Sequence, residues 1–140
     1  MDRLRQRLAR EEGFTLIELL VVIVIIGILL AIAVPSYLGF KDRANDSAAQ
    51  SDLRQAVPSA EAFYSDNTTY TGMNYAALKG IDSGLAPAAI LTLVQVNAGG
   101  TAYCLEATSK TGKVFYFAGP GGTVTSTKPT VAGGATIDCT

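Results

Sequence analysis

Residues 14–34 read FTLIELLVVIVIIGILLAIAV, and this stretch decides the fold. It is 21 residues long and carries one charge, at Glu18. As an α-helix it would be about 31 Å long, enough to cross the hydrocarbon core of a bilayer, which is about 30 Å thick. Residues 1–13 are rich in charge, and from Pro35 onward the composition is that of a water-soluble domain. The sequence therefore predicts a charged leader (1–13), a membrane-spanning half-helix (14–34) and a water-soluble portion (35–140).

The composition of the whole chain argues against several classes of function. The 140 residues are 49% hydrophobic and 16% charged, with a net charge of -1 and no histidine. A balanced charge is not typical of a dedicated nucleic-acid binder. Histidine is the commonest general base and metal ligand, and two cysteines cannot form a paired CxxC zinc site. We therefore expect no catalytic residues, no metal site and no cofactor.

Two simpler explanations of the apolar stretch leave observations unexplained. A secretory signal peptide also places basic residues before an apolar run, but that run is usually about 7–15 residues long and precedes a small-residue cleavage site. Here the longer run leads directly into Pro35-Ser36-Tyr37. A plain single-span anchor does not explain Glu18, because a carboxylate inside a span costs free energy and usually marks a partner.

The junction between leader and apolar run reads Glu12-Gly13-Phe14-Thr15-Leu16-Ile17-Glu18. It resembles the class III signal of the type IV pilin superfamily, which includes pilus subunits and the pseudopilins of type II secretion. In that family a short charged leader ends in Gly, an aromatic residue follows, and a Glu stands four residues further on. The resemblance implies that a prepilin peptidase cuts between Gly13 and Phe14 and N-methylates Phe14. The leader has a net charge of +1, which agrees with a cytoplasmic leader and an outward-facing soluble part.

The resemblance also implies a role for Glu18 in assembly. Glu18 would neutralise the N-terminal amine of Phe14 on the neighbouring subunit and so set the axial register of a filament. Both charges are costly in an apolar core unless they are paired. The alternative is an exposed carboxylate close to the membrane surface.

Further along the helix, other residues match family positions. Gly27 and Pro35 weaken the helix between them, because Gly lowers helix stability and Pro removes a hydrogen bond. In pili of this family the matching stretch is often unwound; close helix packing in the membrane is the alternative for Gly27. Tyr37, Phe40 and Arg43 match positions that pack between subunits, and their alternative is an interfacial aromatic belt with a solvated arginine.

Helical periodicity continues beyond Pro35. Apolar residues form one stripe at helical spacing: Ala49, Leu53, Ala56, Val57, Ala60, Phe63 and Tyr64. We predict one helix from about Phe14 to about Asp66, whose half at 35–66 is amphipathic. The opposite, polar face carries Asp52, Arg54, Ser59, Glu61 and Ser65. Earlier on the helix, Asp42 and Asp46 lie beside Lys41 and Arg43 and are expected to form a solvated face.

The remainder, 67–140, has the pattern of a small sheet. We expect turns at 67–74, a short helical turn at 75–79 stopped by Gly80, and a loop at 81–87. Strands are predicted at 90–96, 101–108, 113–118 and 123–127, separated by glycine-rich turns. The predicted fold is α+β, a long N-terminal helix packed on a small antiparallel sheet, as in type IV pilins.

Cys104 and Cys139 are the two cysteines of the chain. In an outward-facing domain the default expectation is a disulfide, and relatives in the family commonly close a C-terminal loop in this way. Such a ring would contribute roughly 3–4 kcal/mol. Two reduced, buried thiols are the alternative.

Three functions remain open at this point. The first is a pilin that polymerises into an extracellular filament for adhesion, motility or DNA uptake. The others are a pseudopilin or minor pilin, and a membrane-anchored binding domain that does not polymerise. The implied partners are other copies of the chain, the prepilin peptidase, an inner-membrane assembly platform and, before assembly, the membrane. After cleavage the chain would have seven basic and nine acidic side chains, so strong nucleic-acid binding is not expected. Sequons at Asn45 and Asn67 are weak signals for glycosylation.

Overall fold

The computed structural model describes residues 14–129 and residue 139. Helix α2 (Leu16–Asn67) is followed by α3 (Tyr75–Ile81) and by strands β1 (Leu91–Val96), β2 (Tyr103–Thr108), β3 (Val114–Gly119) and β4 (Val124–Thr125). Contacts divide the chain into two compact units, with the boundary between Phe40 and Lys41. The first unit contains the apolar half of α2, and the second contains the rest of α2, α3 and the sheet.

Helix α2 is unbroken over 52 residues, including Gly27 and Pro35. Pro35 lacks the N–H that would bond to the carbonyl of Ala31, but its fixed φ is compatible with a helix. Gly27 lies inside the same unbroken helix, between Ile26 and Ile28. Gly27 and Pro35 therefore do not interrupt the helix in the single chain.

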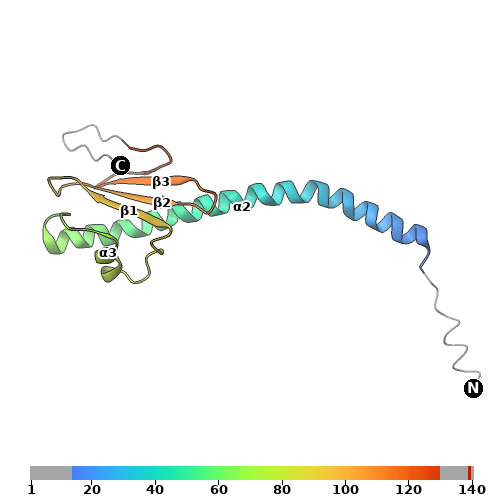
Figure 1. Cartoon of the computed structure of the whole chain (residues 1–140), viewed down its shortest axis with the longest axis horizontal. Coiled ribbons are helices and arrows are strands. Elements are labelled where there is room, and N and C mark those ends of the chain that lie inside the picture. Colours follow the sequence, from blue (N-terminus) through green and yellow to red (C-terminus); the bar gives the residue numbers. More distant parts are fainter. Residues whose placement is uncertain (1–13, 130–138, 140) are drawn as a thin grey trace, which may run out of the picture. The chain divides into compact units, whose positions relative to one another are not determined.

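The four strands form one antiparallel sheet in the order β1-β2-β3-β4, so each strand pairs with the next along the chain. Figure 1 shows β1, β2 and β3 lying on the C-terminal half of α2. Alternate residues of β2 face opposite sides of the sheet: Tyr103, Leu105 and Ala107 join the core, whereas Cys104 lies in a separate cluster with Cys139. The expected α+β fold is confirmed.

The core forms between the predicted stripe of α2 and the inner face of the sheet. Its buried members are Ala49, Leu53, Ala56, Ala60, Tyr70, Met73, Leu78, Leu85, Leu91, Tyr103, Leu105, Ala107, Phe115 and Phe117. Val57 and Phe63 pack against it half-buried. Tyr64 lies at the edge of the stripe, 41% exposed, with its ring 4.7 Å from that of Tyr70.

Several boundaries differ from the sequence-based ones. Helix α3 continues through Gly80 to Ile81, because Asn74 caps its start and the N–H of Asp82 bonds to the carbonyl of Leu78 at its end. Gly80 therefore does not stop it. Strand β2 begins at Tyr103 rather than at residue 101, since the side chain of Asn97 accepts hydrogen bonds from the N–H groups of Thr101 and Ala102 and keeps them in the turn. Strand β4 has two residues where five were expected.

Candidate functional site

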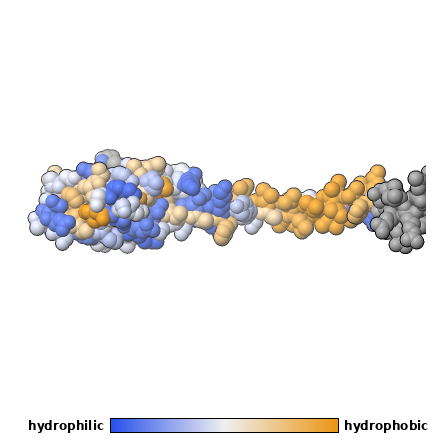
Figure 2. All heavy atoms as spheres, turned by 90° about the horizontal axis from the view of Figure 1, so that it is seen from below, coloured by the Kyte–Doolittle hydropathy of each residue, from blue (hydrophilic) through white to orange (hydrophobic). Residues whose placement is uncertain are grey.

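The N-terminal half of α2 presents an apolar surface without a partner inside the chain. Every residue from Phe14 to Ala44 is exposed, and the large apolar side chains of 14–40 are 47% to 80% exposed. Figure 2 shows hydrophobic atoms covering this part of the helix. Soluble monomers rarely expose so large a contiguous apolar surface, so this one needs a lipid or protein environment.

Within the part of the chain that the structure describes, one helix is long and apolar enough to cross a membrane. It is α2, and its most hydrophobic 18-residue window has a mean hydropathy of 3.3. The predicted span at 14–34 falls on its N-terminal half. Length and composition therefore agree with membrane insertion of this half.

Glu18 has a partner in its own chain that the sequence analysis missed. Its Oε2 accepts hydrogen bonds from the backbone N–H and from the hydroxyl of Thr15, both at 2.8 Å. In return the Glu18 N–H donates to Thr15 Oγ1 at 3.3 Å. This is a capping box, in which the first and fourth residues satisfy each other's free N–H groups at a helix start. The Thr-x-x-Glu spacing was the signal that could have predicted it.

The other predicted assembly residues are spread along the exposed helix. A Cβ at Gly27 would point into open space, with no neighbour beyond the adjoining residues and the backbone of its own helix within 4 Å. Tyr37 is 64% and Phe40 72% exposed, and Arg43 is also exposed. The fold does not bring these residues together, so any joint role requires a second molecule. Gly13, the predicted cleavage residue, lies outside the described residues.

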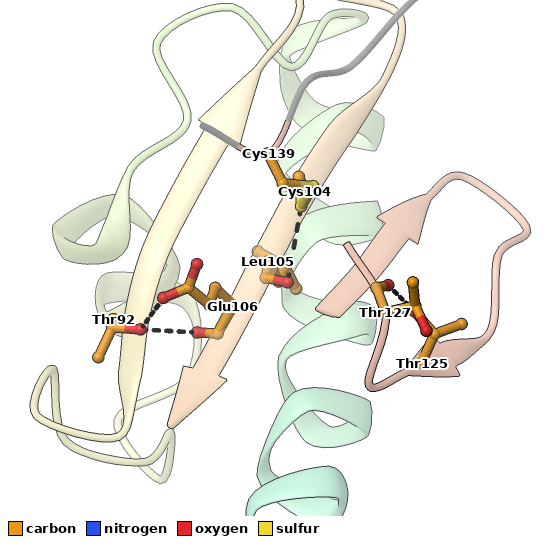
Figure 3. The surroundings of a disulfide bond; sticks show 7 residues. All are labelled: Thr92, Cys104, Leu105, Glu106, Thr125, Thr127 and Cys139. Atoms are coloured by element: carbon orange, nitrogen blue, oxygen red, sulfur yellow. Dashed lines mark hydrogen bonds between the residues drawn. A yellow bond between two sulfur atoms is a disulfide. The ribbon is translucent and has the colours of Figure 1, made fainter. Parts of the chain in front are cut away.

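The disulfide joins Cys104 on β2 to Cys139, with Cα atoms 5.9 Å apart. Both cysteines are buried, and they pack with Ala102 and Tyr116 on the sheet face opposite α2. Figure 3 shows Cys139 lying against β2 at Cys104. The bridge thereby fastens the penultimate residue of the chain to the middle of the sheet.

Asp46 was predicted to be solvated, and this was wrong. It is 8% exposed and accepts hydrogen bonds from Ser109, Thr111 and Lys113. All three residues lie in the turn between the end of β2 at Thr108 and the start of β3 at Val114. These bonds lower the pKa of Asp46 to about 2. The bond from the Lys113 ammonium has the largest effect, followed by those from the two hydroxyls. Helical position alone could not reveal these donors, because they lie more than 60 residues further along the chain.

Ser59 and Glu61, on the predicted polar face, are also removed from full exposure to solvent. Ser59 is 4% exposed. Glu61 is half-buried and accepts hydrogen bonds from the hydroxyls of Tyr70, at 2.9 Å, and Tyr103, at 2.8 Å. Burial, and then the bonds to Glu61, raise the pKa of both tyrosines above the usual value of 10. One carboxylate thus links α2, the segment after it and β2.

Comparison with known proteins places these features in a family. Residues 8–34 match the prokaryotic N-terminal methylation motif. The chain is 38% identical over 128 residues to the type IV wide pilus major component PilA4 of Thermus thermophilus, covering 91% of this chain and 96% of that protein. It is 42% identical over 62 residues to the type IV major pilin protein PilA of Myxococcus xanthus, covering 44% of this chain and 28% of that protein.

A third relative comes from a secretion system. The type II secretion system core protein G of Aeromonas hydrophila is 41% identical over 61 residues, covering 44% of this chain and 43% of that protein. For this relative and the Myxococcus one, the chain spans less than half of their length. Among solved structures, none matches the chain.

The exposed apolar helix and the small antiparallel sheet make an α+β subunit that carries an N-terminal methylation motif. Since the similarity to the Thermus protein covers nearly all of both chains, the chain belongs to the type IV pilin family.

Proposed function

We propose that this chain is the main structural subunit of an extracellular type IV pilus. The observation that carries the proposal is the match to a wide-pilus major component, which covers 96% of that relative and includes the sheet as well as the helix. The exposed apolar half of α2 supports it, because copies packed through this half would remove the apolar surface from water. The proposed role is structural and involves no enzymatic activity.

Before assembly, the chain would lie in the inner membrane as a single-pass protein. The leader, 1–13, would be cytoplasmic and the unit from Lys41 onward would lie outside. A prepilin peptidase would cut between Gly13 and Phe14 and methylate the new N-terminus, as the matching motif suggests. An inner-membrane assembly platform would then move the subunit from the lipid into the filament.

Assembly would use the residues that the single chain leaves exposed. The segment 14–34 would form the filament core and 35–66 would support the globular part, 67–140. The carboxylate of Glu18 would pair with the N-terminal amine of Phe14 on a neighbouring subunit. One oxygen, Oε2, already accepts both bonds from Thr15, which leaves Oε1 to face the neighbour. The capping box and the intersubunit pair are therefore compatible.

A pseudopilin role is the second candidate, favoured by the similarity to secretion protein G. That similarity covers 61 residues and 44% of this chain, against 91% for the pilus component. Because the similarity to the pilus component extends over the sheet as well as the helix, we favour the pilus.

The test is electron microscopy of cells that lack the gene for this chain. Loss of surface filaments, restored by the wild-type chain, is the expected result. Unchanged filaments would overturn the proposal and favour a minor pilin or pseudopilin. Complementation with a chain that carries an exposed-surface change such as Asp66→Ala serves as the matched control, and it should restore filaments.

A further inference from the structure

A buried charge marks the point where α2 first joins the globular unit. Residues 14–44 are all exposed, and Asp46 is the first buried residue of the helix. The next buried residues on α2 are Ala49 and Leu53, which are apolar. The polar contact of Asp46 therefore lies between the free helix and the apolar core.

Three side chains from one turn hold the carboxylate of Asp46. Ser109 and Thr111 donate to Oδ1 at 2.8 Å and 2.6 Å, and Lys113 donates to Oδ2 at 2.7 Å. The turn is closed by its own backbone bonds, from Ser109 N to the carbonyl of Lys113 and from Gly112 N to the carbonyl of Ser109. The three donors are thus fixed in one short loop that is continuous with the sheet. We call this group of Asp46, Ser109, Thr111 and Lys113 the Asp46 node.

The node supplies directional contacts where the apolar packing is shallow. Ala49, one turn further along, offers a single methyl group, and such a contact tolerates rotation or sliding of a helix. Hydrogen bonds depend on both distance and angle, and buried ionic groups are best attested as devices that fix register. The Asp46 node thus adds directional contacts at the point where α2 meets the turn between β2 and β3.

We propose that the Asp46 node is an anchor that keeps α2 docked from residue 46 onward when the exposed segment 14–44 is bent, unwound or pulled. The use of this anchor under tension rests on the proposed filament function, in which the exposed N-terminal part of α2 makes the contacts between subunits. Force would then reach the globular unit along α2 and act first on the node. Without the node, separation would begin at the turn that contains Ala49 and proceed toward Leu53.

Hydrogen exchange with mass spectrometry, on the full chain in detergent micelles, tests the anchor. In Asp46→Ala, amides of residues 45–53 should exchange about tenfold faster than in the wild type, since even one lost bond to a charged group changes local opening by about that factor. Amides of β1 and β2 should keep their wild-type rates. Asp42→Ala is the matched control, because Asp42 is exposed and lies one turn earlier; it should exchange like the wild type.

Two outcomes would overturn the anchor: unchanged exchange at 45–53, or equal acceleration throughout the unit. If Asp46→Ala does not fold, Lys113→Met replaces it. The Lys113 side chain is 66% exposed, so this change removes the ionic donor at the surface, and it should accelerate exchange in the same peptide by a smaller factor.

Stretching single filaments in an optical trap tests the role under tension. Filaments made only of Asp46→Ala subunits should extend irreversibly at a lower force than wild-type filaments, and equal forces would overturn this role. If the wild-type chain forms no filament, the proposed function fails, whereas the exchange experiment still decides whether the node is an anchor.

Discussion

The substitution Glu61→Ala is the sharpest test of which contacts stabilise the globular unit. The change removes the acceptor of two tyrosine hydroxyls, and in the native structure Tyr70 and Tyr103 are 2% and 0% exposed. The ring of Tyr103 packs so closely on Gly119 that a Cβ there would clash with it, so the hydroxyl cannot easily turn toward water. Both donors would be left without their acceptor.

The expected magnitude follows from these contacts. A hydrogen bond to a charged group contributes about 1.5–3 kcal/mol, so two give about 3–6 kcal/mol. Glu61 is half-buried, and water can replace part of what is lost, so we expect a decrease of about 3 kcal/mol in the free energy of unfolding. For a unit of 100 residues this lowers Tm by roughly 12–24 °C. Glu61→Gln keeps one acceptor oxygen and should lose about half as much.

Thermal unfolding of the full chain in detergent, followed by near-ultraviolet circular dichroism, measures this effect. Asp66→Ala is the control, because Asp66 is an exposed acid on the same helix; it should change the free energy of unfolding by less than about 0.5 kcal/mol. A Glu61→Ala chain as stable as this control would refute the reasoning. In the Tyr103→Phe background, the further loss from Glu61→Ala should be smaller, since one bond is already absent.

The remaining predictions concern the core, the disulfide, alkaline pH and assembly. Leu53→Ala removes a fully buried side chain and should lower the free energy of unfolding by about 2–5 kcal/mol in denaturant titration. Alkylation without reduction should label neither Cys104 nor Cys139 in surface-exposed protein, and ready labelling of both would contradict the bridge. The two tyrosines bonded to Glu61 have a raised pKa in the folded state. The stability that depends on their protonated form is therefore present below about pH 10 and is lost as the pH rises above it. Absorbance at 295 nm should show these tyrosines ionising only when the fold is lost. Glu18→Val should still insert in the membrane and be cut, but should not polymerise efficiently, since an unpaired buried charge costs about 3–5 kcal/mol; wild-type filament yields from the mutant alone would contradict the pairing.

The sequence predicted what depends on local pattern. The 3.6-residue periodicity from Ala49 to Phe63 identified the face of α2 that packs on the sheet, and alternation between glycine-rich turns located the strands. The register of β1 and the shortness of β4 could not be predicted, because they depend on pairing between strands. Asn97 shows how a single side chain moves a boundary, since it accepts bonds from Thr101 and Ala102 within the β1–β2 turn and so delays the start of β2.

Charged residues on α2 were the least predictable part. Asp46 and Glu61 look solvated on a helical wheel, but each accepts hydrogen bonds from distant segments. Ser109 lies 63 residues after Asp46, and Tyr103 lies 42 residues after Glu61. Helical periodicity contains no information about such partners. Glu18 differs from these two, because its capping partner Thr15 is three residues away and could have been predicted from the sequence.

The measurement that tests the central claim most directly is mass spectrometry of filaments sheared from the cell surface. The account predicts that this chain is their main component and that it begins at an N-methylated Phe14, with residues 1–13 absent. Sheared filaments that lack the chain, or that contain it with the leader still attached at Gly13, would contradict the account.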